Sequence, residues 1–198
     1  GRNMDNKRIH IFGGGTISHV ASHLALCAPA FGNTAKKLFR ILKWECSHTM
    51  DVFLELTKMA NPEASHLVTN EDVERRVQEL IDDDRTRIIV FNCAMCDFDG
   101  FVDGHRGKYV ARPATNQETH MTLQPKAKIV STIRQKRKDI FLVAFKETCG
   151  ASEDEQYIKA LNLCKQASAN LVFANDTHFR RNMIVTPEEA RYHVTEDR

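Results

Sequence analysis

Two short runs of almost unbroken apolar residues, at 87–91 and 140–145, constrain the fold of this chain more than any other feature. A strand that is apolar on both of its faces has to be covered on both sides, which is typical of parallel sheets. Apolar residues at helical spacing precede the first run at 70–81 and follow the second run from Ser152 onward. Strands that alternate with helices favour a mostly parallel sheet. The sequence therefore predicts an α/β domain of three layers, with helices on both faces of the sheet.

Helix starts are marked by capping residues. Thr69, with Asp72 three places further on, is expected to cap the helix at 70–81. Ser152 precedes an acidic first turn, and both features favour a helix start there. Two more helices are expected, one after Gly32 and one from about 127 to 135.

Shorter patterns place the other strands. Residues 8–12 alternate apolar and polar side chains and end in a glycine turn, which indicates a strand. Residues 17–31 have no clean period and contain Pro29, so a loop is expected there. Further strands are expected at 52–56, 66–69, 171–174 and 183–185. This order of elements is Rossmann-like.

The segment 97–125 differs from the rest of the chain. It is polar, contains glycines and Pro113, and offers at most one strand, around 121–123. An irregular connection of this length inside a compact domain is usually either functional or paired with another chain. We therefore expect an extended dimerisation arm and a homodimer.

Composition excludes several classes of function. The formal net charge of the 198 residues is +2, which favours neither a nucleic-acid nor a membrane partner. We expect a cytoplasmic protein with a leader or tag remnant at 1–7 and a single domain at 8–198. The six cysteines are expected to be reduced thiols, and Cys93 and Cys96 lack a second close pair that would complete a metal site.

Polar and glycine residues follow the predicted strands at their carboxyl ends. They include residues 13–16, Asp97, residues 147–148 and residues 175–176. In an open parallel sheet, ligands bind beyond this edge. Glycine turns there leave backbone N–H groups free to approach phosphate oxygens. These positions are therefore candidate binding residues.

The same positions carry a resemblance to a known family. Residues 14–16 read Gly-Gly-Thr, 93–98 read Cys-Ala-Met-Cys-Asp-Phe, 142–148 read Leu-Val-Ala-Phe-Lys-Glu-Thr, and 174–176 read Ala-Asn-Asp. Lys108 lies about ten residues after Asp97. In this order and spacing, from 8 to 187, the motifs resemble the phosphopantothenate–cysteine ligase family, the synthetase domain of the DNA/pantothenate metabolism flavoproteins.

The resemblance implies a reaction and a set of site residues. The family uses CTP or ATP, with Mg²⁺, to activate 4′-phosphopantothenate as an acyl-nucleotide, which cysteine then attacks in coenzyme A biosynthesis. Lys108 and Asn175 would be catalytic. The implied nucleotide-binding residues are Gly14, Gly15, Thr16, Gly32, Ala94, Asp97, Lys108, Ala127, Lys128, Ile129, Val130, Phe145, Lys159 and Lys165.

The first loop departs from the family pattern. The family carries an asparagine that lines the phosphopantothenate site, and this chain has Ala28 there. The family's two serines are replaced by Ala30 and Phe31, and its arginine by Leu24. Two alternatives therefore stand beside the ligase: a non-catalytic nucleotide-binding homologue, and a relative acting on a different carboxylate or nucleotide substrate.

Overall fold

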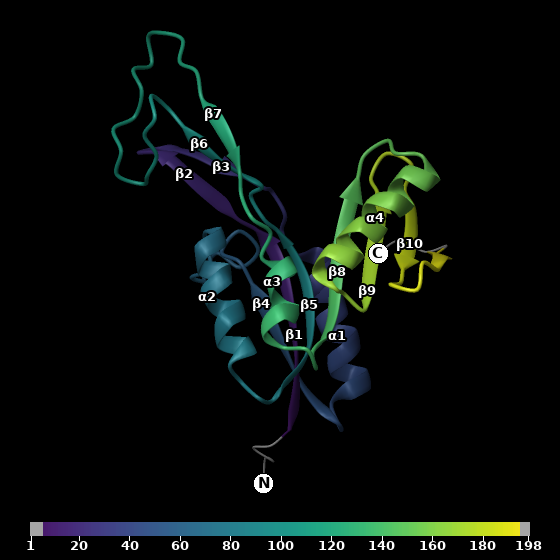
Figure 1. The fold of residues 1–198 in the computed structure, drawn as a ribbon. Helices are drawn as coiled ribbons and strands as arrows, with labels where there is room; N and C mark the ends of the chain where they lie inside the picture. The colour runs from purple at the N-terminus through teal and green to yellow at the C-terminus, as the bar shows by residue number, and fades with distance from the viewer. Residues whose placement is uncertain (1–5, 195–198) are drawn as a thin grey trace.

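The computed structural model describes residues 6–194, and residues 1–5 of the expected leader lie outside the described residues, as do 195–198. The strands of the main sheet are β1 (Lys7–Gly15), β4 (Met50–Leu56), β5 (Thr86–Ala94), β8 (Phe141–Thr148), β9 (Leu171–Asp176), β10 (Arg181–Val185) and β11 (Arg191–Val194). They form a seven-stranded sheet in the order β11-β10-β9-β8-β5-β1-β4 (Figure 1). The five strands from β9 to β4 are parallel, and β10 and β11 are antiparallel additions at one edge.

Helices cover both faces of this sheet. In the described residues they are α1 (Asn33–Cys46), α2 (Asn70–Ile81), α3 (Val130–Lys136) and α4 (Glu153–Ala167). On one face Ala35 of α1 packs with Ile11. On the other face Val73 of α2 and Ile133 of α3 belong to the same buried cluster as Phe12. Ile11 and Phe12 are successive residues of β1, so their side chains enter opposite layers. The expected three-layer architecture is confirmed.

Both predicted helix caps are present. The hydroxyl of Thr69 accepts a hydrogen bond from the Asp72 N–H at 3.3 Å, and the Asp72 carboxylate accepts one from the Thr69 N–H at 3.0 Å. The hydroxyl of Ser152 accepts from the Glu155 N–H at 3.2 Å. Each contact satisfies an N–H group that the helix itself leaves without an acceptor.

The loop expected at 17–31 is confirmed for 28–31 and wrong for 17–27. Residues 17–27 form an antiparallel hairpin of β2 (Ile17–Ala21) and β3 (Leu24–Cys27). The pairing register shifts between His19 and Ala21, which breaks the alternation of side chains on which a strand prediction depends. The turn also places His23 at φ 60°, without the glycine that normally marks such a position.

Two further strand predictions need correction. Residues 66–69 form only an isolated bridge, between Thr69 and Ile17. The carbonyl of Leu67 accepts from Lys58, whereas that of Val68 accepts from Ile17, so the hydrogen bonds go to two different segments and no ladder develops. Strand β11 was not expected, because its four residues are mostly exposed and carry no apolar pattern.

The segment 97–125 projects from the body as an arm (Figure 1). It contains two strands rather than one, β6 (Phe98–Phe101) and β7 (Thr122–Pro125), paired antiparallel. The base of the arm is fixed by Asp99, whose carboxylate contacts Lys126 at 3.1 Å and Arg106 at 2.9 Å. The helix expected from 127 begins later, at Val130, because residues 126–128 are occupied by this connection.

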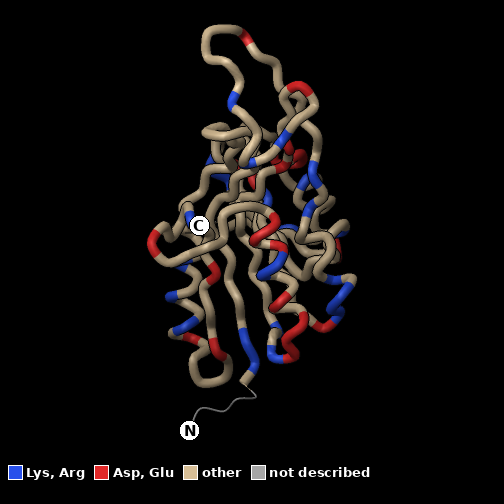
Figure 2. Tube along the Cα trace, turned by 90° about the vertical axis from the view of Figure 1, so that its left-hand side faces the viewer, with Lys and Arg blue, Asp and Glu red and all other residues tan. Residues whose placement is uncertain are grey.

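Charges of both signs are interspersed along the chain (Figure 2), in agreement with the net charge of +2. Among the described residues, no helix combines the length and the apolar composition that crossing a bilayer requires.

Candidate functional site

A cleft of about 1000 Å³ opens at the carboxyl ends of the central parallel strands. The ends of β1, β5 and β8 form its floor, and the start of α1, the connection before α3 and one side of α4 form its walls. This is the edge at which the sequence places ligand-binding residues. Ten of the expected residues line the cleft: Gly14, Gly32, Ala94, Asp97, Ala127, Lys128, Ile129, Val130, Phe145 and Lys159.

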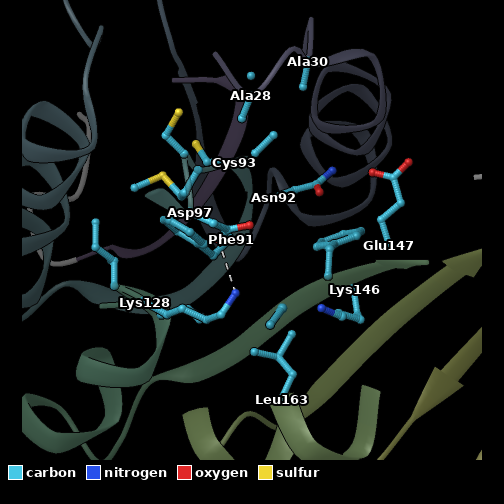
Figure 3. A pocket seen from close by; sticks show the side chains of 18 of the residues that line it. Ala28, Ala30, Phe91, Asn92, Cys93, Asp97, Lys128, Lys146, Glu147 and Leu163 are labelled. Atoms are coloured by element: carbon cyan, nitrogen blue, oxygen red, sulfur yellow. Dashed lines mark hydrogen bonds and ion pairs between the residues drawn. The ribbon is translucent and has the colours of Figure 1, made fainter. Parts of the chain in front are cut away.

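Four lysines line this cleft, of which Lys126 is paired with Glu71 and Asp99 and the other three come from three different elements. Lys146 comes from the end of β8, Lys128 from the connection before α3, and Lys159 from α4. Figure 3 shows the amines of Lys128 and Lys146 directed toward one another. Like charges repel, so an anion bound between these amines would stabilise the arrangement. The cluster has the charge that a polyphosphate requires.

Lys146 is the least solvated of the three. Its amine makes no hydrogen bond or ion pair with any described residue. Burial lowers the pKa of Lys146, the positive charges of Lys128 and Lys159 lower it further, and the charge of Asp97 opposes this without compensating. A half-buried cation without a partner is a strong candidate for an anion ligand.

Asp97 lies on the same side of the cleft. Its carboxylate is 3.4 Å from the amine of Lys128, and both side chains are more than half exposed (Figure 3). An exposed ion pair of this kind contributes at most about 1 kcal/mol, so a ligand can replace it at little cost. Asp97 is therefore available to accept hydrogen bonds from a bound sugar or base.

Of the three residues of the Gly-Gly-Thr turn, Gly14 lines the cleft, whereas Gly15 and Thr16 pack against other parts of the protein. Gly14 lines the cleft with φ 104°, and a Cβ there would lie 2.1 Å from Oγ1 of Thr57. A Cβ on Gly15 would lie 1.9 Å from the carbonyl oxygen of Ala28, so this glycine permits close contact with the first loop. Thr16 is fully buried, and its hydroxyl accepts from the Cys96 N–H at 2.9 Å. Neither Gly15 nor Thr16 lines the cleft.

Three other expected residues also lie outside the cleft lining. Lys108 is exposed in the arm, where its amine lies 5.8 Å from the ring centroid of Tyr109. Lys165 faces away from the cleft and pairs with Glu189 at 2.6 Å. Asn175 lies in β9, next to Glu147 of β8 in the sheet register.

The Asn-Asp pair at the end of β9 is held by hydrogen bonds to neighbouring segments. Asp176, next to Asn175, is fully buried and accepts hydrogen bonds from the Thr148 hydroxyl at 2.7 Å and from the N–H groups of Ala151 and Phe179 at 2.9 Å. Although burial opposes it, these bonds together lower the pKa of Asp176. Asp176 therefore connects the turn after β9 to the loop after β8 by hydrogen bonds. The end of β8 is part of the floor of the cleft.

The motif at 93–96 supplies one half-buried thiol, Cys93, and one buried thiol, Cys96. Burial raises the pKa of Cys93, and burial also raises the pKa of Cys96, so both stay protonated near neutral pH. Among the described residues, no three His, Cys, Asp or Glu side chains are grouped closely enough to hold a metal ion.

Three strand-end side chains also line the cleft: Glu147, which the sequence places among the candidate binding residues, and Asn92 and Lys146, which it does not. Each lies at the end of a strand whose preceding residues are apolar. The sequence signal for such a site residue is a polar side chain near the carboxyl end of an apolar strand, because ligands bind at that edge of the sheet.

Solved structures with this fold come from pantothenate and coenzyme A metabolism. The DNA/pantothenate metabolism flavoprotein from Streptococcus pneumoniae matches with a TM-score of 0.79 and 19% identity, over 95% of this chain and 92% of its own. The C-terminal domain of the coenzyme A biosynthesis bifunctional protein CoaBC matches with a TM-score of 0.64 and 12% identity, over 95% of this chain and 85% of its own.

A mutant of Cab2 in complex with phosphopantothenate-cysteine matches with a TM-score of 0.60 and 13% identity, over 97% of this chain and 81% of its own. No protein-family model and no curated protein sequence matches the chain. At these identities the likeness concerns the backbone. The chain therefore has the fold of the pantothenate-metabolism flavoprotein and coenzyme A biosynthesis domains, the family that its sequence motifs resemble.

Proposed function

We propose that this chain is a nucleotide-dependent ligase that couples 4′-phosphopantothenate to cysteine through an acyl-nucleotide, in coenzyme A biosynthesis. The observation that carries the proposal is the convergence of Lys128, Lys146 and Lys159 on one cleft at the carboxyl ends of the parallel strands. Activating a carboxylate with CTP or ATP brings several negative charges together. A fixed group of cations lowers the free energy of that arrangement, and Mg²⁺ would accompany the nucleotide.

The residues divide the work by chemistry. Lys128, Lys146 and Lys159 would neutralise the phosphates, and Asp97 would accept hydrogen bonds from the base or sugar. Gly14 lines the cleft with its backbone, and packing requires glycine there because a side chain would collide with Thr57. The backbone at 127–130 also lines the cleft beside the lysines.

Lys108 has a role in this proposal only if a second chain is present. Its side chain projects from the arm rather than into the cleft of its own chain. The arm exposes Phe98, Met121 and Leu123, which are apolar residues suited to an interface. We therefore propose a homodimer through the arms, in which Lys108 approaches the reacting centre of the other copy.

The apolar first loop favours a second candidate function. Ala28, Pro29, Ala30 and Phe31 all line the cleft, and none offers a side-chain hydrogen bond to a phosphate or hydroxyl group. A related ligase that activates a different, less polar carboxylate fits this wall. The same loop also fits a protein that binds the nucleotide but catalyses no reaction.

Two measurements separate these candidates. Calorimetric titration with CTP and with ATP tests the nucleotide site, and Asp97→Ala should weaken binding by about 1–3 kcal/mol, the range of a charge-assisted hydrogen bond. Asp84→Ala, at an exposed position outside the cleft, is the matched control. Pyrophosphate release with phosphopantothenate and cysteine tests the reaction. Nucleotide binding without pyrophosphate release would favour the second candidate, and absence of nucleotide binding would refute the proposed function.

A further inference from the structure

The last residues of β8 present opposite charges to opposite sides of the cleft. Val90 of β5 and Val143 of β8 pack in the cluster beneath α1, so Asn92, Phe145 and Glu147, which follow at intervals of two, share that side. Lys146 faces the other side, with Lys128 and Lys159. Figure 3 shows the same separation: Glu147 extends toward Ala30 and the start of α1, whereas Lys146 points toward Lys128 and Leu163.

We propose that Glu147 binds the ammonium group of the amine substrate, on the α1 side of the cleft. This inference rests on the proposed function, because it gives a binding site to the amine, which is the second substrate of that reaction. Glu147 is exposed to the cleft, and its carboxylate makes no hydrogen bond or ion pair with a described residue. Its charge is therefore available to a ligand.

The other acidic residue of the cleft does not compete for this role. Asp97 is paired with Lys128 and lies on the side of the lysines, where a cationic ligand would be repelled. On the α1 side, by contrast, the lining residues other than Glu147 are neutral: Asn92 and the residues of the first loop and of the start of α1, 28–34. A primary amine is protonated at neutral pH. A single carboxylate among neutral groups would attract this ammonium group to one defined position.

Asn92 completes the recognition of an ammonium group. Figure 3 places its carboxamide between Ala28 and Glu147, on the same side of the cleft. An ammonium group has three N–H donors, which a carboxylate and a carboxamide oxygen together satisfy in part. Glu147 and the lysines therefore offer separate positions in one cleft for an ammonium group and for phosphates. The ligand class is thus a small primary amine, such as an amino acid.

Ligand-observed NMR on the full chain, with Mg²⁺ and ATP or CTP present, tests this site directly. The probes are L-cysteine and 3-mercaptopropionate, which lacks only the amine and its charge. The wild type should bind cysteine in preference to 3-mercaptopropionate. Glu147→Gln, which keeps the shape and removes the charge, should weaken cysteine binding by roughly tenfold or more, the equivalent of one charge-assisted hydrogen bond.

Glu74→Gln is the control, because Glu74 is an exposed residue of α2 outside the cleft. It should bind cysteine like the wild type, and nucleotide affinity should be the same in all three proteins. Equal cysteine binding by wild type and Glu147→Gln, no cysteine binding by wild type, or equal binding of the two probes would each overturn the proposal. Binding through Glu147 without release of pyrophosphate from the nucleotide in the presence of phosphopantothenate would leave the amine site standing and remove the proposed reaction.

Discussion

Thr16 and Asn70 form a fully buried hydrogen bond that joins the glycine turn after β1 to the first turn of α2. The Thr16 hydroxyl donates to Oδ1 of Asn70 at 2.5 Å. The carboxamide of Asn70 in turn donates to the carbonyl of Cys96 at 2.8 Å. Three segments that are distant in the sequence therefore meet at one polar junction, and two of its residues, Asn70 and Cys96, line the cleft. The threonine of the Gly-Gly-Thr turn holds the cleft in shape rather than lining it.

This junction predicts a loss of stability in Thr16→Val. Valine has the shape of threonine but removes both the donor to Oδ1 of Asn70 and the acceptor of the Cys96 N–H, which keep only their mutual contact at 3.3 Å. The loss of hydrogen bonds by buried groups costs about 1–3 kcal/mol. Urea unfolding should therefore show a lower midpoint with an unchanged slope. Thr119→Val, at an exposed position of the arm, should unfold like the wild type. An unchanged midpoint in Thr16→Val would show that the hydroxyl contributes nothing to stability.

Glu55 predicts the response of stability to acid. Burial raises the pKa of Glu55, but hydrogen bonds with His10 and Arg76 outweigh burial and lower it from 4.5 to about 2. The folded state thus binds the proton less tightly than the unfolded state. The resulting stabilisation is complete above pH 4.5 and is lost as the pH falls toward 2. It amounts to about 3 kcal/mol for a shift of this size.

Chemical unfolding at several pH values between 7 and 3 measures this effect. Glu55→Gln should be less stable than the wild type at pH 7, and its stability should decline less on acidification. Glu79→Gln is the control, since Glu79 pairs with the same Arg76 but is largely exposed. Parallel stability curves for wild type and Glu55→Gln would contradict the assignment.

Lys146 predicts a pH-dependent nucleotide affinity. Because its pKa is lowered by burial and by the neighbouring lysines, its amine loses its proton at a lower pH than an ordinary lysine. Only the protonated amine attracts phosphate, so affinity should fall as the pH is raised from neutral toward that pKa. Lys146→Met should weaken binding of CTP or ATP at pH 7 and flatten this dependence. Titration calorimetry across the pH range measures both effects.

The control for that experiment is Lys37→Met, an exposed lysine of α1 outside the cleft, which should behave like the wild type. Lys146→Arg should retain part of the affinity, because it keeps the charge and changes its geometry. Identical affinities for wild type and Lys146→Met at neutral pH would exclude Lys146 from the phosphate site.

Lys108 predicts a separation of activity from stability. Light scattering should give a mass near twice the 22.6 kDa of one chain if the arms pair. Lys108→Ala should then lower turnover roughly a hundredfold, the usual effect of removing a charge from a reacting centre. Its melting temperature should be unchanged, because the side chain is exposed. A monomer with full activity in the alanine variant would refute both the arm dimer and this role of Lys108.

The sequence by itself determined the elements and the edge at which the site lies. The buried runs of β5 and β8, and the caps at Thr69 and Ser152, depend on residues a few positions apart, so their patterns predict local structure. The order of strands and helices then required a three-layer parallel sheet. Since ligands bind at the carboxyl ends of such strands, Gly14 and Asp97 were placed near the cleft without coordinates, and the family resemblance added Phe145.

Only the tertiary structure decided which polar residues share the cleft. Whether a side chain faces a cavity depends on which strands become neighbours and on the register between them, and these are set by packing between distant segments. Thr16 is therefore buried against Asn70, Lys165 is turned toward Glu189, and Lys146 and Glu147 are held on opposite sides of one strand end. The hairpin at β2 and β3 was hidden for a similar reason, because its irregular register is stabilised by contact with the arm rather than by its own sequence pattern.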